Sequence, residues 1–222
     1  MKSSDKNDQS LEQTIRTYDT IAPGYCAKTR LDKYLRWERE YIRKLLDLVA
    51  SPEPKILDVG CGDGRHCRII NQENGQAVGV DLSEGMLTEA RKRCPDIDLH
   101  QMNMLALEFD DGSFDGIWSS GSIYHVTKAT VPAVLSEFER VLRASGVLAM
   151  SFKLGTGEGL EANPGSYGGR PRYFAYYTRE EMTRLLEEAK FSVVETSLYP
   201  EKIFGADNLQ IWARKSCGAR SI

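Results

Sequence analysis

Ile56-Leu-Asp-Val-Gly-Cys-Gly-Asp-Gly-Arg-His66 is the stretch that decides the fold of this chain. It starts as an apolar run typical of a buried strand and ends in a glycine-rich turn that opens a helix. The glycines allow the backbone to turn tightly and to approach a ligand without a Cβ in the way. A pyrophosphate-binding GxGxxG turn needs a third small residue where this chain has Arg65. The turn therefore indicates a nucleotide-type ligand and fits a dinucleotide poorly.

A second predicted strand, within Val78-Gly-Val-Asp-Leu-Ser83, ends in an acidic residue about 20 residues after the glycine turn. A carboxylate in this place can accept both ribose hydroxyls, so Asp81 would select an adenosine-type ligand that lacks a 2′-phosphate. The alternative is that Asp81 only caps the following helix, which is a common role for Asp. The separation from the glycine turn favours the ligand.

Outward from these two strands, short apolar runs alternate with amphipathic segments along most of the chain. The predicted strands are Lys55–Val59, Ala77–Leu82, Asp98–Met104, Phe114–Ser119, Gly146–Leu154, Phe191–Leu198 and Leu209–Arg214. The predicted helices between them are Arg65–Glu73, Glu84–Arg93, Thr130–Arg143 and Arg179–Ala189. This alternation predicts an α/β, doubly wound fold with a mainly parallel sheet covered on both faces. The last two runs should form an antiparallel hairpin at the sheet edge, so that six of seven strands are parallel.

Two segments differ from this alternation. The N-terminus is predicted to be a loose polar tail over residues 1–10, followed by a helical cap over residues 11–50. Its helices are expected at Gln9–Ile21 and Leu31–Ala50. Residues 155–177 contain six glycines, two prolines and five aromatic residues, and this composition predicts a long, mobile substrate lid loop. Arg170 and Arg172 in that loop are candidates for binding an anionic group of the substrate.

Bulk properties narrow the class of protein. With 222 residues, the chain is expected to form a single domain with a large core. Its net charge of −3 gives no general attraction for phosphate backbones, so a nucleic-acid partner is not favoured. No apolar run approaches the roughly 18 residues of a membrane span, and the polar N-terminus lacks a secretory signal. Five cysteines without CxxC pairing predict free thiols, no metal site and a cytoplasmic location.

Three further motifs accompany the glycine turn: Val80-Asp-Leu-Ser83 followed by Met86, Phe109-Asp-Asp-Gly-Ser-Phe-Asp-Gly-Ile117, and Glu139-Arg-Val-Leu-Arg-Ala-Ser-Gly-Val147. Together they make the chain resemble the class I S-adenosylmethionine-dependent methyltransferase superfamily over residues 18–214. The resemblance implies a Rossmann-like, three-layer α/β/α fold and S-adenosylmethionine as cofactor. It also implies methyl transfer to oxygen or nitrogen of a small-molecule acceptor. These motifs are specific to the superfamily and not to any acceptor.

The resemblance also assigns cofactor-binding positions at the ends of the first four strands. The methionine end of the cofactor is expected at Asp58 and at the backbone of Gly60, Cys61 and Gly62. The ribose is expected at Asp81, and the adenine beside Leu82, Met86, Asn103 and Met104. Asn103 departs from the aspartate common in the family, but an amide can both accept from the exocyclic amine and donate to a ring nitrogen. Ser119, after the fourth strand, matches a position that borders the cofactor.

His125 is the candidate general base, because many superfamily members have histidine at the matching point, next to the transferred methyl group. Histidine suits proton removal near neutral pH, although a structural histidine bonded to a loop carbonyl is an open alternative. Tyr18, Tyr25 and Arg30 match an N-terminal flap over the cofactor, and Tyr18 is a second catalytic candidate. The alternative for the aromatic residues is that they only cover the sheet. His66 and His100 are expected on the surface of a helix and a strand.

Three other functions share part of this pattern. A tRNA or other nucleic-acid methyltransferase would have every cofactor motif but should show a basic patch, and the clusters Arg39–Lys44 and Arg91–Arg93 are too small for one. A nicotinamide oxidoreductase is disfavoured by Arg65. A regulatory subunit that binds the cofactor without catalysis would lack a reason for His125. The expected assembly is a monomer or a homodimer.

Overall fold

The computed structural model describes residues 3–28, 32–162, 167–200 and 207–216, with side chains described over 9–27, 37–162, 168–200 and 207–216. The helices are α1 (Ser3–Lys28), α2 (Asp32–Leu48), α3 (Arg65–Gln72), α4 (Glu84–Arg93), α5 (Val131–Val141) and α6 (Arg179–Glu188), with short 3₁₀ helices η1 (Ile123–His125) and η2 (Tyr167–Gly169). The strands are β1 (Lys55–Val59), β2 (Gln76–Asp81), β3 (Asp98–Gln101), β4 (Phe114–Ser120), β5 (Leu142–Leu154), β6 (Glu158–Glu161), β7 (Arg172–Tyr177), β8 (Phe191–Leu198) and β9 (Asn208–Lys215).

One mixed sheet forms the centre of the molecule. Strands β3, β2, β1, β4 and β5 are adjacent in that order and run parallel. Strand β9 pairs antiparallel with β5, and β8 pairs antiparallel with β9. The expected α/β class, its parallel strands and the final antiparallel hairpin are therefore confirmed. The sheet has nine strands instead of the expected seven, because two more form in the segment expected to be a loop.

The predicted lid loop contains a β-hairpin, so its assignment as a long irregular loop is wrong. Strand β6 pairs antiparallel with β7, and β7 adds in parallel to the last two residues of β5. The reason is a difference in strand length: β4 ends at Ser120, opposite Ser151, whereas β5 continues to Leu154. The free edge of Lys153 and Leu154 accepts the aromatic β7, whose residues favour strands. The hairpin is thereby held just beyond the end of β4.

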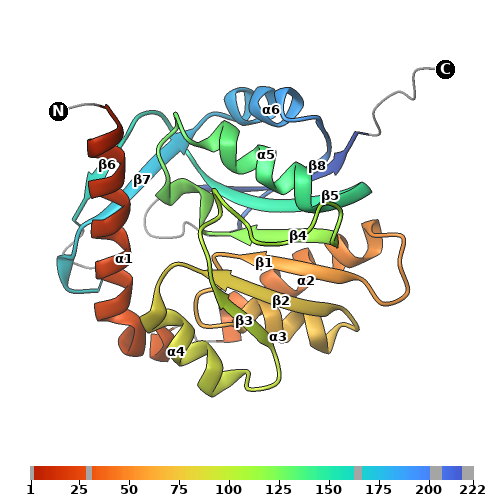
Figure 1. Ribbon diagram of the computed structural model, residues 1–222, viewed down its shortest axis with the longest axis horizontal. Coiled ribbons are helices and arrows are strands. Elements are labelled where there is room, and N and C mark those ends of the chain that lie inside the picture. Colours follow the sequence, from red (N-terminus) through yellow and green to blue (C-terminus); the bar gives the residue numbers. More distant parts are fainter. Residues whose placement is uncertain (1–2, 29–31, 163–166, 201–206, 217–222) are drawn as a thin grey trace.

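Helices cover the two faces of the sheet with separate cores. On one face α5 and α6 pack on Leu57, Ile117 and their neighbours. On the other face α2, α3 and α4 pack on Ile56, Trp118 and their neighbours. Successive residues of β1 and β4 thus point to opposite faces, as a strand buried on both sides requires. Figure 1 shows α5 and α6 above the sheet in this view and α2, α3 and α4 below it.

Helix α1 replaces the expected loose tail from Ser3 onward and continues past the predicted end at Ile21 to Lys28. In Figure 1 it stands at the side of the sheet toward which β1, β2 and β4 run. Tertiary contacts hold it at both ends of that edge. The Asp19 carboxylate accepts hydrogen bonds from the Ser83 hydroxyl (2.6 Å) and the Gly85 N–H (3.0 Å) at the start of α4. The Thr17 hydroxyl donates to the Pro171 carbonyl (2.7 Å) just before β7.

No helix in the described ranges is both long enough and apolar enough to cross a bilayer. The cysteines with described side chains, at 26, 61, 67 and 94, are buried free thiols, while Cys217 lies outside the described residues.

The contact between α1 and α4 makes the glycine at position 85 necessary. A Cβ on Gly85 would lie 2.7 Å from Cα and 2.8 Å from the carbonyl oxygen of Asp19, whereas a Cβ on Gly24 in α1 would meet nothing within 4 Å. We expect Gly85→Ala to lower the free energy of unfolding by about 1–3 kcal/mol through overpacking against backbone. Gly24→Ala should raise it by about 0.5–1 kcal/mol, as alanine does in a helix. Urea unfolding measures both, and equal effects would show that α1 is not held at this contact.

Candidate active site

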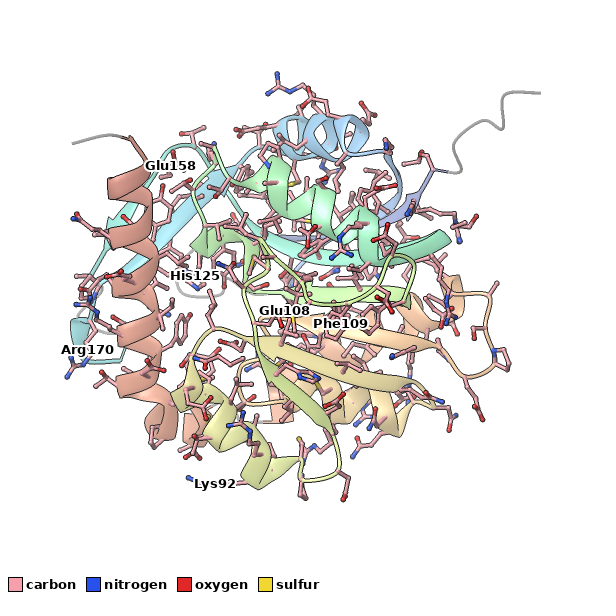
Figure 2. All side chains as sticks on the ribbon, viewed as in Figure 1. Lys92, Glu108, Phe109, His125, Glu158 and Arg170 are labelled. Carbon is pink, nitrogen blue, oxygen red and sulfur yellow. The ribbon has the colours of Figure 1, made fainter. Side chains whose placement is uncertain are left out.

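A cavity with an empty volume of about 1230 Å³, including its mouth, lies where the parallel strands end. Its floor comes from the segments that follow β1, β2, β3 and β4, and its far wall comes from α1 and η1. This is the crevice at the carboxyl ends of the strands where open α/β sheets bind ligands. Figure 2 shows His125 between α1 and the sheet.

The glycine turn is rigidly placed against β2. The N–H groups of Gly60 and Cys61 both donate to the Val80 carbonyl, at 2.8 and 3.0 Å. Gly60 has φ of 75°, and a Cβ there would lie 2.3 Å from Cβ of Ser122, so glycine is required for conformation and for space. The backbone of Gly60, Cys61 and Gly62 lines the cavity directly.

Asp81 lines the cavity at the end of β2. Its carboxylate accepts the N–H of Gly62 (2.9 Å) and the N–H of Ser83 (2.8 Å), and burial raises the pKa of the carboxyl group. The alternative in which Asp81 caps α4 is wrong, because the N-cap is Ser83, whose hydroxyl accepts the Met86 N–H (3.1 Å). Each carboxylate oxygen keeps a second lone pair for a ligand.

Asn103 has a defined amide orientation in the cavity wall. Its side-chain oxygen accepts the N–H of Leu105 (3.0 Å), and a backbone N–H can only donate. One lone pair of the oxygen is therefore used, and the bond fixes which end of the amide carries the NH₂ group that can donate to a ligand. Both roles expected for this amide stay open, and donation to a ring nitrogen is the one that does not share an atom with the backbone bond.

Tyr18 and His125 form a hydrogen-bonded pair across the cavity. The Tyr173 carbonyl accepts from His125 Nδ1 (2.6 Å), so this nitrogen carries the proton. Nε2 is then an acceptor for the Tyr18 hydroxyl at 2.9 Å, and Arg172 donates to the same hydroxyl at 3.3 Å. Burial, with Arg172 and Lys153 nearby, lowers the pKa of His125 to about 3, so the imidazole is neutral. Burial likewise raises the pKa of Tyr18.

The structural contact expected for His125 uses only Nδ1, so it leaves Nε2 for the proposed role as a base. The bond from Nδ1 to a carbonyl is the structural role, and Nε2 faces Tyr18 at the cavity wall. Of the two arginines expected at the substrate, Arg172 is 3% exposed and contacts Tyr18, whereas Arg170 is exposed. In Figure 2 Arg170 points away from the molecule on the outer side of α1.

A second group of polar side chains in the cavity was not predicted. Glu38, on α2, accepts from Arg65 (3.0 Å), and its same oxygen lies 3.2 Å from His66 Nε2. His66 is 3% exposed and packs edge-on against Trp118, so its expected surface position is wrong. The cause is α2, which contacts α3 and covers its first turn. The sequence contained one signal for this polar group, which is the position of His66 directly after the glycine turn. No sequence pattern indicated Glu38.

Comparisons with known proteins agree with this architecture. Residues 56–146 match the family model of a methyltransferase domain. Over 148 residues the chain is 33% identical to a demethylmenaquinone methyltransferase of Symbiobacterium thermophilum, covering 62% of this chain and 58% of that protein. Over 111 residues it is 37% identical to a dTDP-3-amino-3,4,6-trideoxy-alpha-D-glucopyranose N,N-dimethyltransferase of Streptomyces venezuelae, covering 48% of this chain and 46% of that protein.

The fold is also that of a solved S-adenosylmethionine-dependent methyltransferase from Methanosarcina mazei, with a TM-score of 0.69 and 17% identity, covering 77% of this chain and 96% of that one. The chain is therefore similar to methyltransferases in the sequence of residues 56–146 and in its fold. It spans about half of the length of the curated relatives described above.

S-adenosylmethionine, named for the solved Methanosarcina mazei structure, fits the residues of the cavity. The glycine turn allows close backbone approach, and the carboxylate of Asp81 can accept the hydroxyls of an adenosine-type ligand. Oε2 of Glu38, a residue that lines the cavity, is buried and has no hydrogen-bond partner within the described structure. Such an atom is costly in a folded protein and marks a place for a ligand or water.

Most of the residues expected at the methyltransferase cofactor line the cavity. They are Tyr18, Tyr25, Gly60, Cys61, Gly62, Asp81, Leu82, Met86, Asn103, Met104 and His125. Asp58 and Ser119 do not line it. Asp58 lies fully buried beneath the turn, where it accepts from the Cys67 thiol (3.2 Å) and burial raises its pKa to about 6. Ser119 is buried and hydrogen-bonded to Ser122, which does line the cavity. Arg30 lies outside the described residues.

The low pKa of His125 predicts that the stability of this protein depends on pH. In the unfolded chain, His125 takes up a proton as pH falls through about 6.5. In the folded protein it stays neutral until the pH reaches about 3. The stability conferred by the neutral imidazole is therefore lost as pH falls between these two values. Between pH 7 and 5 the wild type should lose about 2 kcal/mol more than His125→Asn, whose amide can keep the bond to Tyr173. Denaturant unfolding at both pH values measures the difference. Parallel losses would show that His125 is not buried as a neutral group.

Proposed function

We propose that this chain transfers a methyl group from S-adenosylmethionine to an oxygen or nitrogen atom of a small-molecule acceptor. The proposal is carried by the neutral Tyr18–His125 pair, which lines the same cavity as the glycine turn. When bound, S-adenosylmethionine supplies a methyl group on a positively charged sulfur that departs as a neutral thioether. The protein then has to align the acceptor, exclude water and take up a proton.

The cofactor end of the cavity is assigned to the residues beside β1, β2 and β3. Asp81 accepts the ribose hydroxyls, Met86 and Met104 flank the adenine with Leu82, and the Asn103 amide donates to a ring nitrogen. The N–H of Gly62 already donates to Asp81. The turn therefore helps ligand binding mainly by letting the ligand come close to the backbone, and less by offering free N–H donors. Tyr25 and Tyr18, whose rings contact edge-on at 5.9 Å, cover the ligand from α1.

The proton of the acceptor is taken up through the hydroxyl of Tyr18. As the acceptor's oxygen or nitrogen forms its bond to carbon, its proton passes to the Tyr18 oxygen, and the Tyr18 proton passes to Nε2 of His125. The imidazole is then protonated on both nitrogens, with Nδ1 still held by the Tyr173 carbonyl. The net charge of the site does not change, because one positive charge is lost from sulfur while one is gained on the ring.

Neighbouring cations act differently on the two members of the pair. Arg172 donates to the Tyr18 hydroxyl and stabilises negative charge that develops on the Tyr18 oxygen while its proton moves. Arg172 and Lys153 disfavour positive charge on His125, so the protonated ring releases its proton readily after the transfer. The name of the Streptomyces venezuelae relative, an N,N-dimethyltransferase, supports nitrogen as one acceptor atom.

Calorimetry and a product screen test this function. We expect heat of binding with S-adenosylhomocysteine and none with NADH, because the turn suits a nucleoside without pyrophosphate. Methyl-labelled cofactor incubated with metabolite extracts should then label a product one methyl group heavier than its precursor, identified by mass spectrometry. NADH uptake without S-adenosylhomocysteine binding would refute the cofactor. Cofactor binding without transfer to any acceptor would instead support a non-catalytic regulatory subunit.

Removal of a single hydroxyl tests the proton path. Tyr18→Phe keeps the ring that packs on Tyr25 but removes the O–H that links the acceptor to His125. We expect kcat to fall by about 10²- to 10⁴-fold, with the affinity for S-adenosylhomocysteine nearly unchanged. Tyr176→Phe is the matched control, since it removes a hydroxyl that donates to Glu161 in the hairpin and lies outside the cavity lining, and it should leave kcat unchanged. A normal kcat in Tyr18→Phe would rule the path out.

A further inference from the structure

The carboxylate of Glu38 has one oxygen without a hydrogen-bond donor among the residues that the structure describes. Glu38 lies on α2, is 6% exposed and lines the cavity. Its Oε1 accepts from Arg65 and lies near His66, while Oε2 is buried without a hydrogen-bond partner. Neither the glycine turn nor the Tyr18–His125 pair accounts for this oxygen. It is a strong acceptor that lacks a donor.

The charge of Glu38 is fixed by its neighbours. Burial alone would raise its pKa, but Arg65 and His66 lower the pKa to about 2, so the group is an anion throughout the neutral range. A buried anionic oxygen without a donor is unfavourable, and a hydrogen bond from a charged donor is among the strongest that a protein site forms. A cationic N–H group of a ligand in the cavity would supply the missing partner and match the charge of the carboxylate.

The order of the strands indicates which part of a ligand reaches Glu38. The sheet runs β3, β2, β1, β4, and the cavity follows it from Asn103 after β3, past Asp81 on β2, to the turn after β1. His66 lies on the β4 side, where its ring centre is 5.5 Å from that of Trp118. With the adenine beside β3 and the ribose at Asp81, the remaining part of the cofactor crosses the turn toward β4. That part is the methionine tail, which carries an ammonium group with three N–H donors.

We propose that the Glu38 carboxylate binds the α-ammonium group of the cofactor's methionine tail, with Arg65 holding the carboxylate in place. This assignment rests on the proposed cofactor and adds a residue that no motif contains. The Arg65 contact occupies the other carboxylate oxygen, so Oε2 is left to face the ligand. Glu38 is thus a specificity-determining residue that distinguishes a ligand with an amino-acid tail from a plain nucleoside.

Calorimetry with two ligands separates this role from a structural one. S-adenosylhomocysteine carries the amino-acid tail, whereas 5′-methylthioadenosine has the same nucleoside and sulfur without it. We expect Glu38→Gln to weaken S-adenosylhomocysteine by about tenfold to a hundredfold and to change the affinity for 5′-methylthioadenosine by less than about twofold. Should Glu38→Gln fail to fold, Glu38→Asp keeps the negative charge but moves the carboxylate one methylene away from the ligand. It should also weaken S-adenosylhomocysteine binding and leave the affinity for 5′-methylthioadenosine nearly unchanged.

Glu73→Gln is the matched control. Glu73 also joins α2 to α3 through ion pairs, with Arg39 and Arg43, but it lies at the far end of α3 outside the cavity. It should leave both affinities unchanged. Equal weakening of both ligands by Glu38→Gln would overturn the proposal. Unchanged S-adenosylhomocysteine binding in Glu38→Gln would overturn it too, and would indicate instead that Glu38 binds an amine of the acceptor. Absence of S-adenosylhomocysteine binding in the wild type would instead refute the proposed function itself.

Discussion

The hydrogen bond from the Gly62 N–H to the Asp81 carboxylate is the interaction on which the cofactor end of the site depends. It joins the turn after β1 to the end of β2, and the bonds from Gly60 and Cys61 to the Val80 carbonyl fix the same two segments. Because the three N–H groups of the turn are used inside the protein, the turn cannot bind a diphosphate as a nest of free donors would. The cavity is shaped instead for a ligand that needs a carboxylate and close backbone approach.

The opposite wall depends on the unequal lengths of β4 and β5. Because β5 extends past the end of β4, β7 pairs with the last residues of β5 beyond β4. This pairing brings Arg172 and the Tyr173 carbonyl to His125. Helix α1 is tied to the same strand, because the Tyr173 N–H donates to the Thr14 hydroxyl (2.9 Å). Tyr18, one turn further along α1, therefore meets a histidine 107 positions away. Three segments distant in sequence thus hold one hydrogen-bonded Tyr18–His125 pair at the cavity.

Features with a local signal were predictable from the sequence, and features made by tertiary contacts were not. The glycine turn, Asp81 and the parallel strands with their final antiparallel hairpin follow from short patterns, and the turn and Asp81 line the cavity. The hairpin of β6 and β7 was missed because its register depends on the free edge of β5. Glu38 lies on a helix whose sequence pattern indicates only which face packs on the sheet. The alternation of β4 buries Ser119, while its neighbour Ser120 lines the cavity.

The buried charges of the cavity are separated by sign along its length. Near β4 and α3 the anionic Glu38 is balanced by Arg65, and beyond the end of β4 the cations Arg172 and Lys153 lie behind the aromatic residues. Those cations, together with burial, keep His125 neutral before reaction. A neutral imidazole whose Nε2 accepts from Tyr18 is the form that the proposed proton path requires. Arg172, which donates to the Tyr18 hydroxyl, would stabilise a phenolate-like oxygen, whereas Arg172 and Lys153 both disfavour charge on the ring. The same electrostatics therefore favour the neutral folded state and would make a protonated imidazole short-lived in the proposed path.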